Sequence, residues 1–386
     1  MAGVTLSSAV RTNLSALQST SQMMSKVQEK LSTGKKVNSA LDNPNSFFTA
    51  QGLSNRAGDL GTLLDDMGQT VQTLKAADKG ITSISGLVDA AKAKANQASQ
   101  TSSQTQRAQY AKEFNELMGQ IESVAKDSGY KGKNLLGGTG NDLSVTFNET
   151  GTSKLDISAV NFTDTTSTTG LNLSDLASGT SGTTTITLTN GTATTALTSG
   201  SLLTSDSEFA AGDVISLTDT NGTEIGKMEV KATTTVGDLE KFLDDTDGVS
   251  ASLSANTMTV TSEFKLTMKS SSSAVGSFAD RTTNNSAESG FAKDTDIDAA
   301  LKKLKGAQDT LRSQASTFGT NLSIVQNRQD FTKAMINTLE EGAGKLTLAD
   351  TNQEGANLLA LQTQQSLAST ALSLAASADQ NVLRLF

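Results

Sequence analysis

The feature that most constrains the fold is a regular spacing of residues in the last part of the chain, Asn352–Phe386. Steps of three and four residues alternate along it, which is the repeat of a helix that packs lengthwise against another helix. This row comprises Leu358, Leu361, Gln365, Ala368, Leu372, Ala375, Asp379, Val382 and Phe386. A second row, of Leu367, Ala371, Leu374, Ala378 and Leu385, runs beside the first. An apolar face this wide needs a partner that keeps it from water.

The same spacing occurs near the N-terminus and predicts a matching helix. Its row comprises Leu6, Val10, Asn13, Leu17, Thr20, Met24, Val27 and Leu31. We interpret the two ends as parts of one coiled-coil layer. Its predicted assembly interface comprises Leu6, Val10, Asn13, Leu17, Met24, Val27, Leu31, Leu358, Leu361, Ala368, Leu372, Ala375, Val382, Leu385 and Phe386. The alternative is that both ends are ordinary core helices of a globular domain.

Composition excludes several classes of function. The chain has no Cys and no His, so disulfides, the usual zinc, copper and iron sites, and catalytic triads with a His base are excluded. A formal net charge of −9 argues against nucleic acid as a partner. The single proline, Pro44, favours long uninterrupted helices. We therefore expect no enzyme activity, no cofactor and no metal.

The sequence also gives no indication of membrane insertion. It contains no run of about 18 apolar residues, the length that a spanning helix needs. Its first residues lack the basic and apolar regions of a cleaved signal peptide.

Helical patterns lead from both ends towards the middle of the chain. Apolar spacing predicts a helix through residues 60–88, a polar joint at 99–106, and a second helix that ends at Gly129. Helix resumes at Asp294 and continues until Gly342-Ala343-Gly344, before the terminal helix. The acidic residues at 294–298 match a helix N-terminus, and those at 244–247 match a turn. Neither group completes a calcium-binding loop. Lys36 and Lys94 are expected to be solvated or to face another subunit.

The middle of the chain changes to short alternating runs rich in Thr, Ser, Gly and Asp. These predict a hairpin at residues 143–147 and 154–157, strands near 184–188, 214–217 and 225–230, a helix at 234–243, and strands at 249–253 and 258–261. Acidic residues far outnumber basic ones between 142 and 288, whereas basic residues slightly outnumber acidic ones elsewhere. This excess charge favours solubility, and a specific cation or partner surface is the alternative.

Several segments resemble a known family. Residues 11–17, 31–40 and 42–44 are similar to the N-terminal region of bacterial flagellin, and residues 323–331 and 376–386 are similar to its C-terminal region. The periodicity and this resemblance together predict an α+β fold. A long discontinuous α-helical coiled-coil core is built from both chain ends, with a β-hairpin and a central mainly-β outer domain. The resemblance implies a terminal domain of residues 1–42 plus 351–386 lining a filament channel. It also implies a helical middle domain of 43–171 plus 289–350, and an outer insert of 172–288.

The resemblance implies a structural subunit that self-assembles into the helical flagellar filament for swimming. Its implied partners are other copies of itself, the flagellar cap, hook-junction proteins and an export chaperone, and its implied location is extracellular, after export without a cleaved signal peptide. Residues 87–93 lack an arginine that the family's receptor-recognised segment carries, so weak recognition by the innate immune receptor is expected. The alternatives are a hook–filament junction protein and a secreted coiled-coil adhesin that forms a defined trimer.

Overall fold

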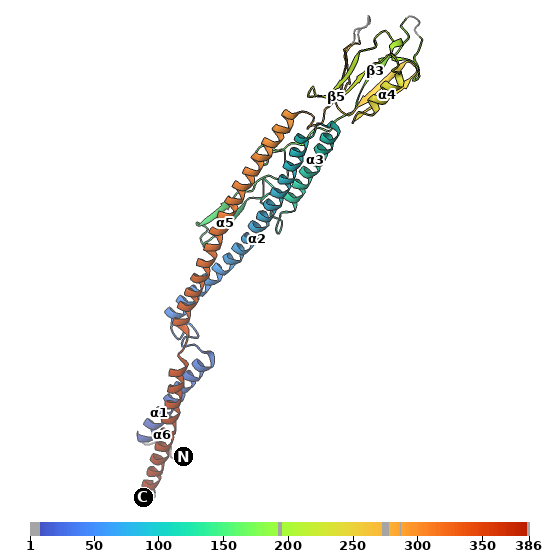
Figure 1. Cartoon of the computed structure of the whole chain (residues 1–386). Coiled ribbons are helices and arrows are strands. Elements are labelled where there is room, and N and C mark those ends of the chain that lie inside the picture. Colours follow the sequence, from blue (N-terminus) through green and yellow to red (C-terminus); the bar gives the residue numbers. More distant parts are fainter. Residues whose placement is uncertain (1–7, 192–194, 272–277, 286, 384–386) are drawn as a thin grey trace. The chain divides into compact units, whose positions relative to one another are not determined.

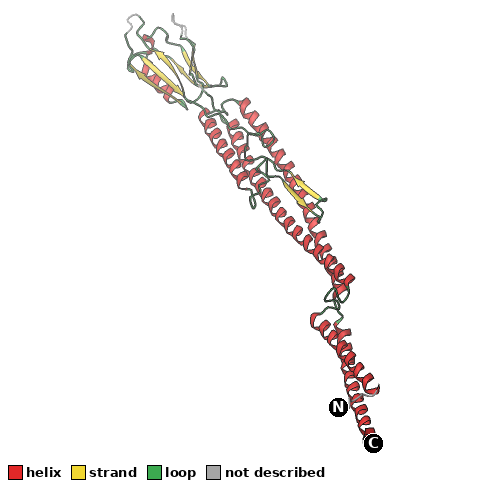
Figure 2. Cartoon of the chain, turned by 180° about the vertical axis from the view of Figure 1, so that it is seen from behind, coloured by secondary structure: helices red, strands yellow, loops and turns green. Residues whose placement is uncertain are grey.

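The computed structural model describes the chain except for residues 1–7, 192–194, 272–277, 286 and 384–386. Its helices are α1 (Ser8–Thr33), α2 (Pro44–Gln100), α3 (Gln104–Asp127), α4 (Val236–Asp244), α5 (Asp294–Thr347) and α6 (Thr351–Leu383), with a short 3-10 helix at Leu203–Ser205. Its strands are β1 (Leu143–Thr146), β2 (Lys154–Ile157), β3 (Gly182–Thr187), β4 (Val214–Thr218), β5 (Glu224–Glu229), β6 (Val249–Ser254), β7 (Thr257–Ser262), β8 (Thr267–Ser270) and β9 (Arg281–Thr282). The predicted α+β fold is confirmed, with helices from both chain ends and a β-rich middle (Figures 1 and 2).

The chain divides into two compact units, and the long helices α2 and α5 each contribute to both. The first unit comprises Met1–Gly68, Val145–Lys154 and Val325–Phe386, and the second comprises Gln69–Ser144 and Leu155–Ile324. Among the described helices, none combines the length and the apolar character needed to cross a membrane.

In the first unit, α1 and α6 come from opposite ends of the chain and pack side by side (Figure 1). We call this pair of helices the terminal hairpin, although no short loop joins them. α1 ends at the predicted glycine, because Gly34 has a φ of +68°, a conformation that residues with a side chain rarely adopt. The backbone N–H of Lys36 donates to the carbonyl of Thr347 at 2.7 Å, and that of Ala349 donates to Gly34 at 3.0 Å. These bonds tie the break between α1 and α2 to the break between α5 and α6.

The end of α5 differs from the sequence-based expectation. Gly342-Ala343-Gly344 lies inside the helix, which continues to Thr347. Ala343 is buried, and a Cβ atom at Gly342 would lie only 3.4 Å from Leu53 of α2. Gly342 therefore lies beside a residue of α2, Gly344 lies beside Leu348 just after α5, and neither glycine ends the helix. The break follows at residues 348–350, where the Asp350 carboxylate accepts hydrogen bonds from the N–H groups of Asn352 and Gln353 and so begins α6.

In the second unit, parts of α2 and α5 lie alongside α3 (Figure 1). Phe114 of α3 packs edge-on against Phe291, with ring centroids 5.6 Å apart, and both rings are buried. Lys94 of α2 forms an ion pair of 2.7 Å with Glu113 of α3, so this lysine is engaged within the chain rather than free. α3 ends at Asp127 with Ser128 as its C-cap, two residues before the predicted Gly129.

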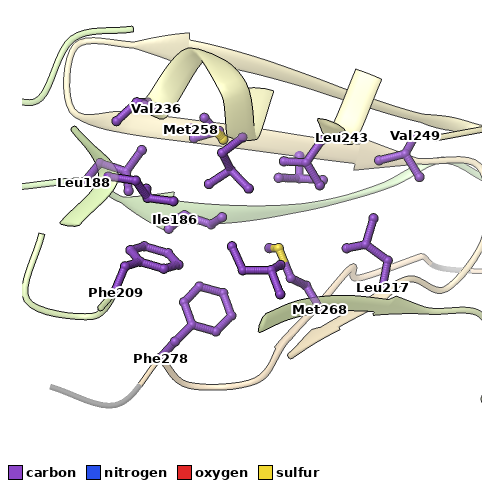
Figure 3. Packing of buried hydrophobic residues seen from close by; sticks show 14 of the residues in the cluster. Ile186, Leu188, Phe209, Leu217, Val236, Leu243, Val249, Met258, Met268 and Phe278 are labelled. Carbon is purple, nitrogen blue, oxygen red and sulfur yellow. The ribbon is translucent and has the colours of Figure 1, made fainter. Parts of the chain in front are cut away.

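The β-rich part of the second unit contains two antiparallel sheets. Their strand orders are β3-β7-β6 and β5-β4-β8-β9. Figure 3 shows how side chains from both sheets and from α4 meet in one apolar core, including Leu243 of α4, Ile186 of β3 and Leu217 of β4. The strands β8 and β9 were not predicted. They are short, and pairing with β4 and with each other defines them more than their own sequence pattern does.

Candidate functional site

The predicted interface residues of the terminal helices lie mostly on the seam inside the hairpin. Val10 and Val27 are buried, each with 8% of its surface exposed. Half-buried members of the set are Asn13, Leu17, Met24, Leu31, Leu358, Leu361, Ala368, Leu372 and Ala375. Leu6, Val382, Leu385 and Phe386 lie outside the residues whose side chains the structure describes. Within a single chain, the residues of the 3.5-residue repeat therefore lie between α1 and α6.

A second set of apolar side chains stays exposed after the hairpin has formed. We call Leu359, Leu367 and Leu374 the α6 stripe. Their exposed fractions are 66%, 67% and 68%. Steps of eight and seven residues are about two helical turns, so the three leucines share one side of α6. On α1, Leu14 and Met23 are also exposed, at 36% and 43%. The hairpin thus presents apolar surface that the chain itself leaves uncovered.

Polar contacts fix how the two terminal helices are joined. Lys30 near the end of α1 forms an ion pair of 3.0 Å with Glu354 in the first turn of α6. The exposed Lys36 ammonium donates to the carbonyl of Lys345 at 2.8 Å and so also caps the last turn of α5. These contacts hold α1 and α6 in one register where both leave the rest of the unit.

The turn between α1 and α2 projects further apolar groups. The Asp42 carboxylate accepts hydrogen bonds from the N–H groups of Ser39 and Asn38, at 2.9 and 3.0 Å. These backbone hydrogen bonds, that from Ser39 first, hold the pKa of Asp42 below its usual range. The turn leaves Leu41 96% exposed, and Phe48 at the start of α2 is 61% exposed. Leu41 and Phe48 are thus further exposed apolar side chains in the first unit.

We expect the turn to open in acid. Because the folded pKa of Asp42 is lowered, its stabilising effect is complete above the ordinary aspartate pKa and is lost as the pH falls through the lowered value. At neutral pH, Asp42→Ala should speed amide exchange at Asn38 and Ser39 by about tenfold, since each loses one acceptor. Hydrogen exchange of this peptide across a pH series measures both effects. Exchange that is unchanged in the variant would contradict this role of Asp42.

The predicted polar joint at residues 99–106 adjoins a buried polar cluster that was not predicted from the sequence, where α3, the start of α5 and the sheets meet in the second unit. Arg107 has only 5% of its surface exposed. Its guanidinium donates to the carbonyls of Thr101 and Ala292 and forms an ion pair of 2.7 Å with Asp294. Gln104 reaches the same Ala292 carbonyl and the buried carboxylate of Asp219. Sequence did contain one signal, because a cation in the first turn of a helix is unfavourable without a partner.

The acidic clusters that the sequence suggested as possible cation sites are partnered within the chain. Within the described residues, no group of three or more acidic side chains gathers closely enough to hold a metal ion. Asp247, from the acidic turn, accepts a hydrogen bond from Ser103, the N-cap residue of α3. Asp294, from the second acidic group, is the partner of Arg107. Both clusters therefore have structural partners.

Comparison with known proteins identifies the two helical ends. Residues 5–141 match the bacterial flagellin N-terminal helical region, and residues 301–386 match the bacterial flagellin C-terminal helical region. Flagellin A of Rhizobium meliloti is 26% identical over 390 residues, covering 97% of this chain and 96% of that protein. The flagellin of Brucella melitensis biotype 1 is 24% identical over 388 residues, covering 100% and 99%.

Solved structures of hook-associated proteins also align with the chain at low similarity. The flagellar hook associated protein-3 of Legionella pneumophila is 14% identical and covers 87% of this chain and 99% of its own, with a TM-score of 0.23. Xanthomonas campestris FlgL is 13% identical and covers 80% and 97%, also with a TM-score of 0.23. The two flagellin regions together span more than half of the chain and include the terminal helices. The chain therefore belongs to the bacterial flagellin family and is a structural subunit of the extracellular flagellar filament.

Proposed function

We propose that the chain polymerises through the outward faces of the terminal hairpin, with the α6 stripe as the central contact between copies. The observation that carries this proposal is that three leucines of one helix side remain about two-thirds exposed although α6 already packs on α1. Burying one leucine side chain stabilises an interface by roughly 1.5–3 kcal/mol. A second copy with the same apolar face is the natural partner for such a surface.

The proposal includes a division of labour along the chain. Residues 1–42 plus 351–386 line the filament channel, residues 43–171 plus 289–350 pack between neighbouring subunits, and residues 172–288 project outward. The few fully buried residues of the terminal hairpin support folding that is completed only when neighbours arrive. The predicted interface residues of α1 and α6 then act first inside the hairpin and give it the shape that neighbours recognise.

Family membership supports further partners and a location. Hook-junction proteins are expected at the base of the filament, a cap at its tip, and a chaperone before export, which proceeds without a cleaved signal peptide. The family is one of structural proteins, and we propose that this chain has no enzymatic activity.

Substituting the α6 stripe tests the proposal. Leu359→Ser, Leu367→Ser and Leu374→Ser together should slow filament growth from short seeds by at least about tenfold, since three buried leucines supply more than the 1.4 kcal/mol of a tenfold change. Light scattering measures the rate, and circular dichroism checks the helix content.

The matched control makes the same number of changes to serine elsewhere on the same helix. Gln353, Gln362 and Gln364 are exposed, and glutamine and leucine have similar helix propensities. The control should grow like the unchanged chain. Equal growth of the leucine variant would exclude the α6 stripe as the contact. A full-length chain that instead remained a discrete oligomer would favour the junction-protein or adhesin alternative.

A further inference from the structure

The outer strand β6 donates hydrogen bonds to a neighbouring helix along the edge that would otherwise be unpaired. β6 ends the three-stranded sheet and has β7 as its only strand neighbour among the described strands. An outer strand normally presents unpaired N–H and C=O groups, onto which a strand of another chain can add. In this sheet, α4 packs along β6.

Three alternate residues of β6 donate their outward N–H groups to α4 and the turn that follows it. Val249 donates to the carbonyl of Thr246 at 3.0 Å. Ala251 donates to the carboxylate of Asp244 at 2.6 Å, and Leu253 donates to that of Glu240 at 3.2 Å. Residues two apart in a strand face the same edge, so these bonds occupy the donors that a further strand would use.

The geometry of α4 explains how it reaches this edge. Glu240 and Asp244 are four residues apart and share one side of the helix. Val236, Leu239 and Leu243 are fully buried in the core between the sheets and anchor α4. Thr235 and Asp238 form a capping box that fixes the start of the helix. The two carboxylates are thus held beside β6 as replacement hydrogen-bond acceptors.

The other sheet has a contrasting outer strand. β5 pairs only with β4 among the described strands, and its Glu224, Lys227 and Glu229 side chains are exposed. β6 ends one sheet and β5 ends the other. If both of these edges were open, β6 of one copy could pair with β5 of the next copy, and copies would join head to tail. Closing one of the two edges prevents such a chain.

We propose that β6 is a latent strand-pairing surface for the outer sheet of a second copy, with β5 as the pairing strand, and that Glu240 and Asp244 hold it closed. This inference rests on the proposed function in one respect, since a filament brings many outer domains to high local concentration. In the filament, the hydrogen-bonded edge of β6 keeps the outer sheets of neighbouring copies from pairing, so that assembly contacts stay in the helical parts of the subunits.

The double variant Glu240→Ala and Asp244→Ala tests the inference in the full-length chain without seeds. Amide exchange in residues 249–254 should become about tenfold faster, because the N–H groups of Ala251 and Leu253 each lose a charged acceptor. Sedimentation velocity should show concentration-dependent association at unchanged helical circular dichroism. In Glu240→Gln with Asp244→Asn, neutral side-chain carbonyl oxygens remain as acceptors, so exchange should speed up less than in the alanine pair and sedimentation should match the unchanged chain.

A second control changes two exposed neighbours, Lys241→Ala in α4 and Asp245→Ala at its C-cap, and should leave exchange and sedimentation as they are. Unchanged exchange in the alanine pair would overturn the role of the carboxylates. Faster exchange without association, or association that accompanies loss of helical signal, would overturn the latent surface. Sedimentation of unseeded chains is independent of filament growth, so failure of the stripe experiment would leave this result standing on its own.

Discussion

A chain shortened by removal of residues 352–386 should form no filaments. The deletion removes almost all of α6 and with it both apolar faces, namely the α6 stripe and the inner row that packs on α1. Val10 and Val27 of α1 then lose their cover, and Lys30 loses its ion-pair partner Glu354. The deletion removes both the proposed contact between copies and the pairing of α1 with α6. We therefore expect no seeded growth at all rather than slower growth.

Electron microscopy and light scattering of seeded samples measure this outcome beside the full-length chain. The internal control is the second unit, which contains no residue of the deleted segment. Its thermal unfolding should be unchanged, so that absent growth reports on assembly. Long filaments from the shortened chain would show that the terminal helix is dispensable and would contradict the proposed interface.

The substitution Phe114→Ala should destabilise the second unit by about 3–5 kcal/mol, the range for removing a large buried aromatic side chain. Phe114 has 2% of its surface exposed and packs edge-on against Phe291, just before α5 begins. The smaller alanine side chain leaves a cavity and removes the aromatic pair between α3 and the segment just before α5. Urea unfolding, followed by helical circular dichroism, measures the change.

The matched control is the same substitution at an exposed phenylalanine. Phe331 on α5 has 56% of its surface exposed. Phe331→Ala should change monomer stability by no more than about 0.5 kcal/mol, as is usual for surface positions. If Phe114→Ala were as mild as Phe331→Ala, the aromatic contact would not be part of the core of this unit.

The helical architecture could be predicted from sequence because its signals are local. Alternating steps of three and four residues predict the helices, and Gly34 predicts the end of α1. The same repeat cannot distinguish a partner helix in the same chain from one in a neighbouring copy. The assignment of the set that includes Val10 and Leu358 to assembly therefore stays a prediction, since within a single chain these residues are buried or half-buried between the two helices of the hairpin.

Other features depended on contacts that no local pattern encodes. Gly342 lies within α5 beside Leu53 of another helix, where a Cβ atom would be 3.4 Å from that leucine side chain. Arg107 is buried because a carbonyl and a carboxylate from the distant start of α5 surround it. β9 is a strand only because β8 lies beside it. In each case, the deciding partner is remote in sequence, so propensity and spacing alone leave the position open.

The cross-tie between the two helix breaks has a mechanical consequence. Both connections to the terminal hairpin lose their helical stiffness at the same level, at residues 34–43 and 348–350. The backbone hydrogen bonds from Lys36 to Thr347 and from Ala349 to Gly34 join these two connecting segments to each other. Because these hydrogen bonds join the two non-helical connections directly, a change in the backbone of one connection would break bonds to the other, so the two helix breaks form one structural unit.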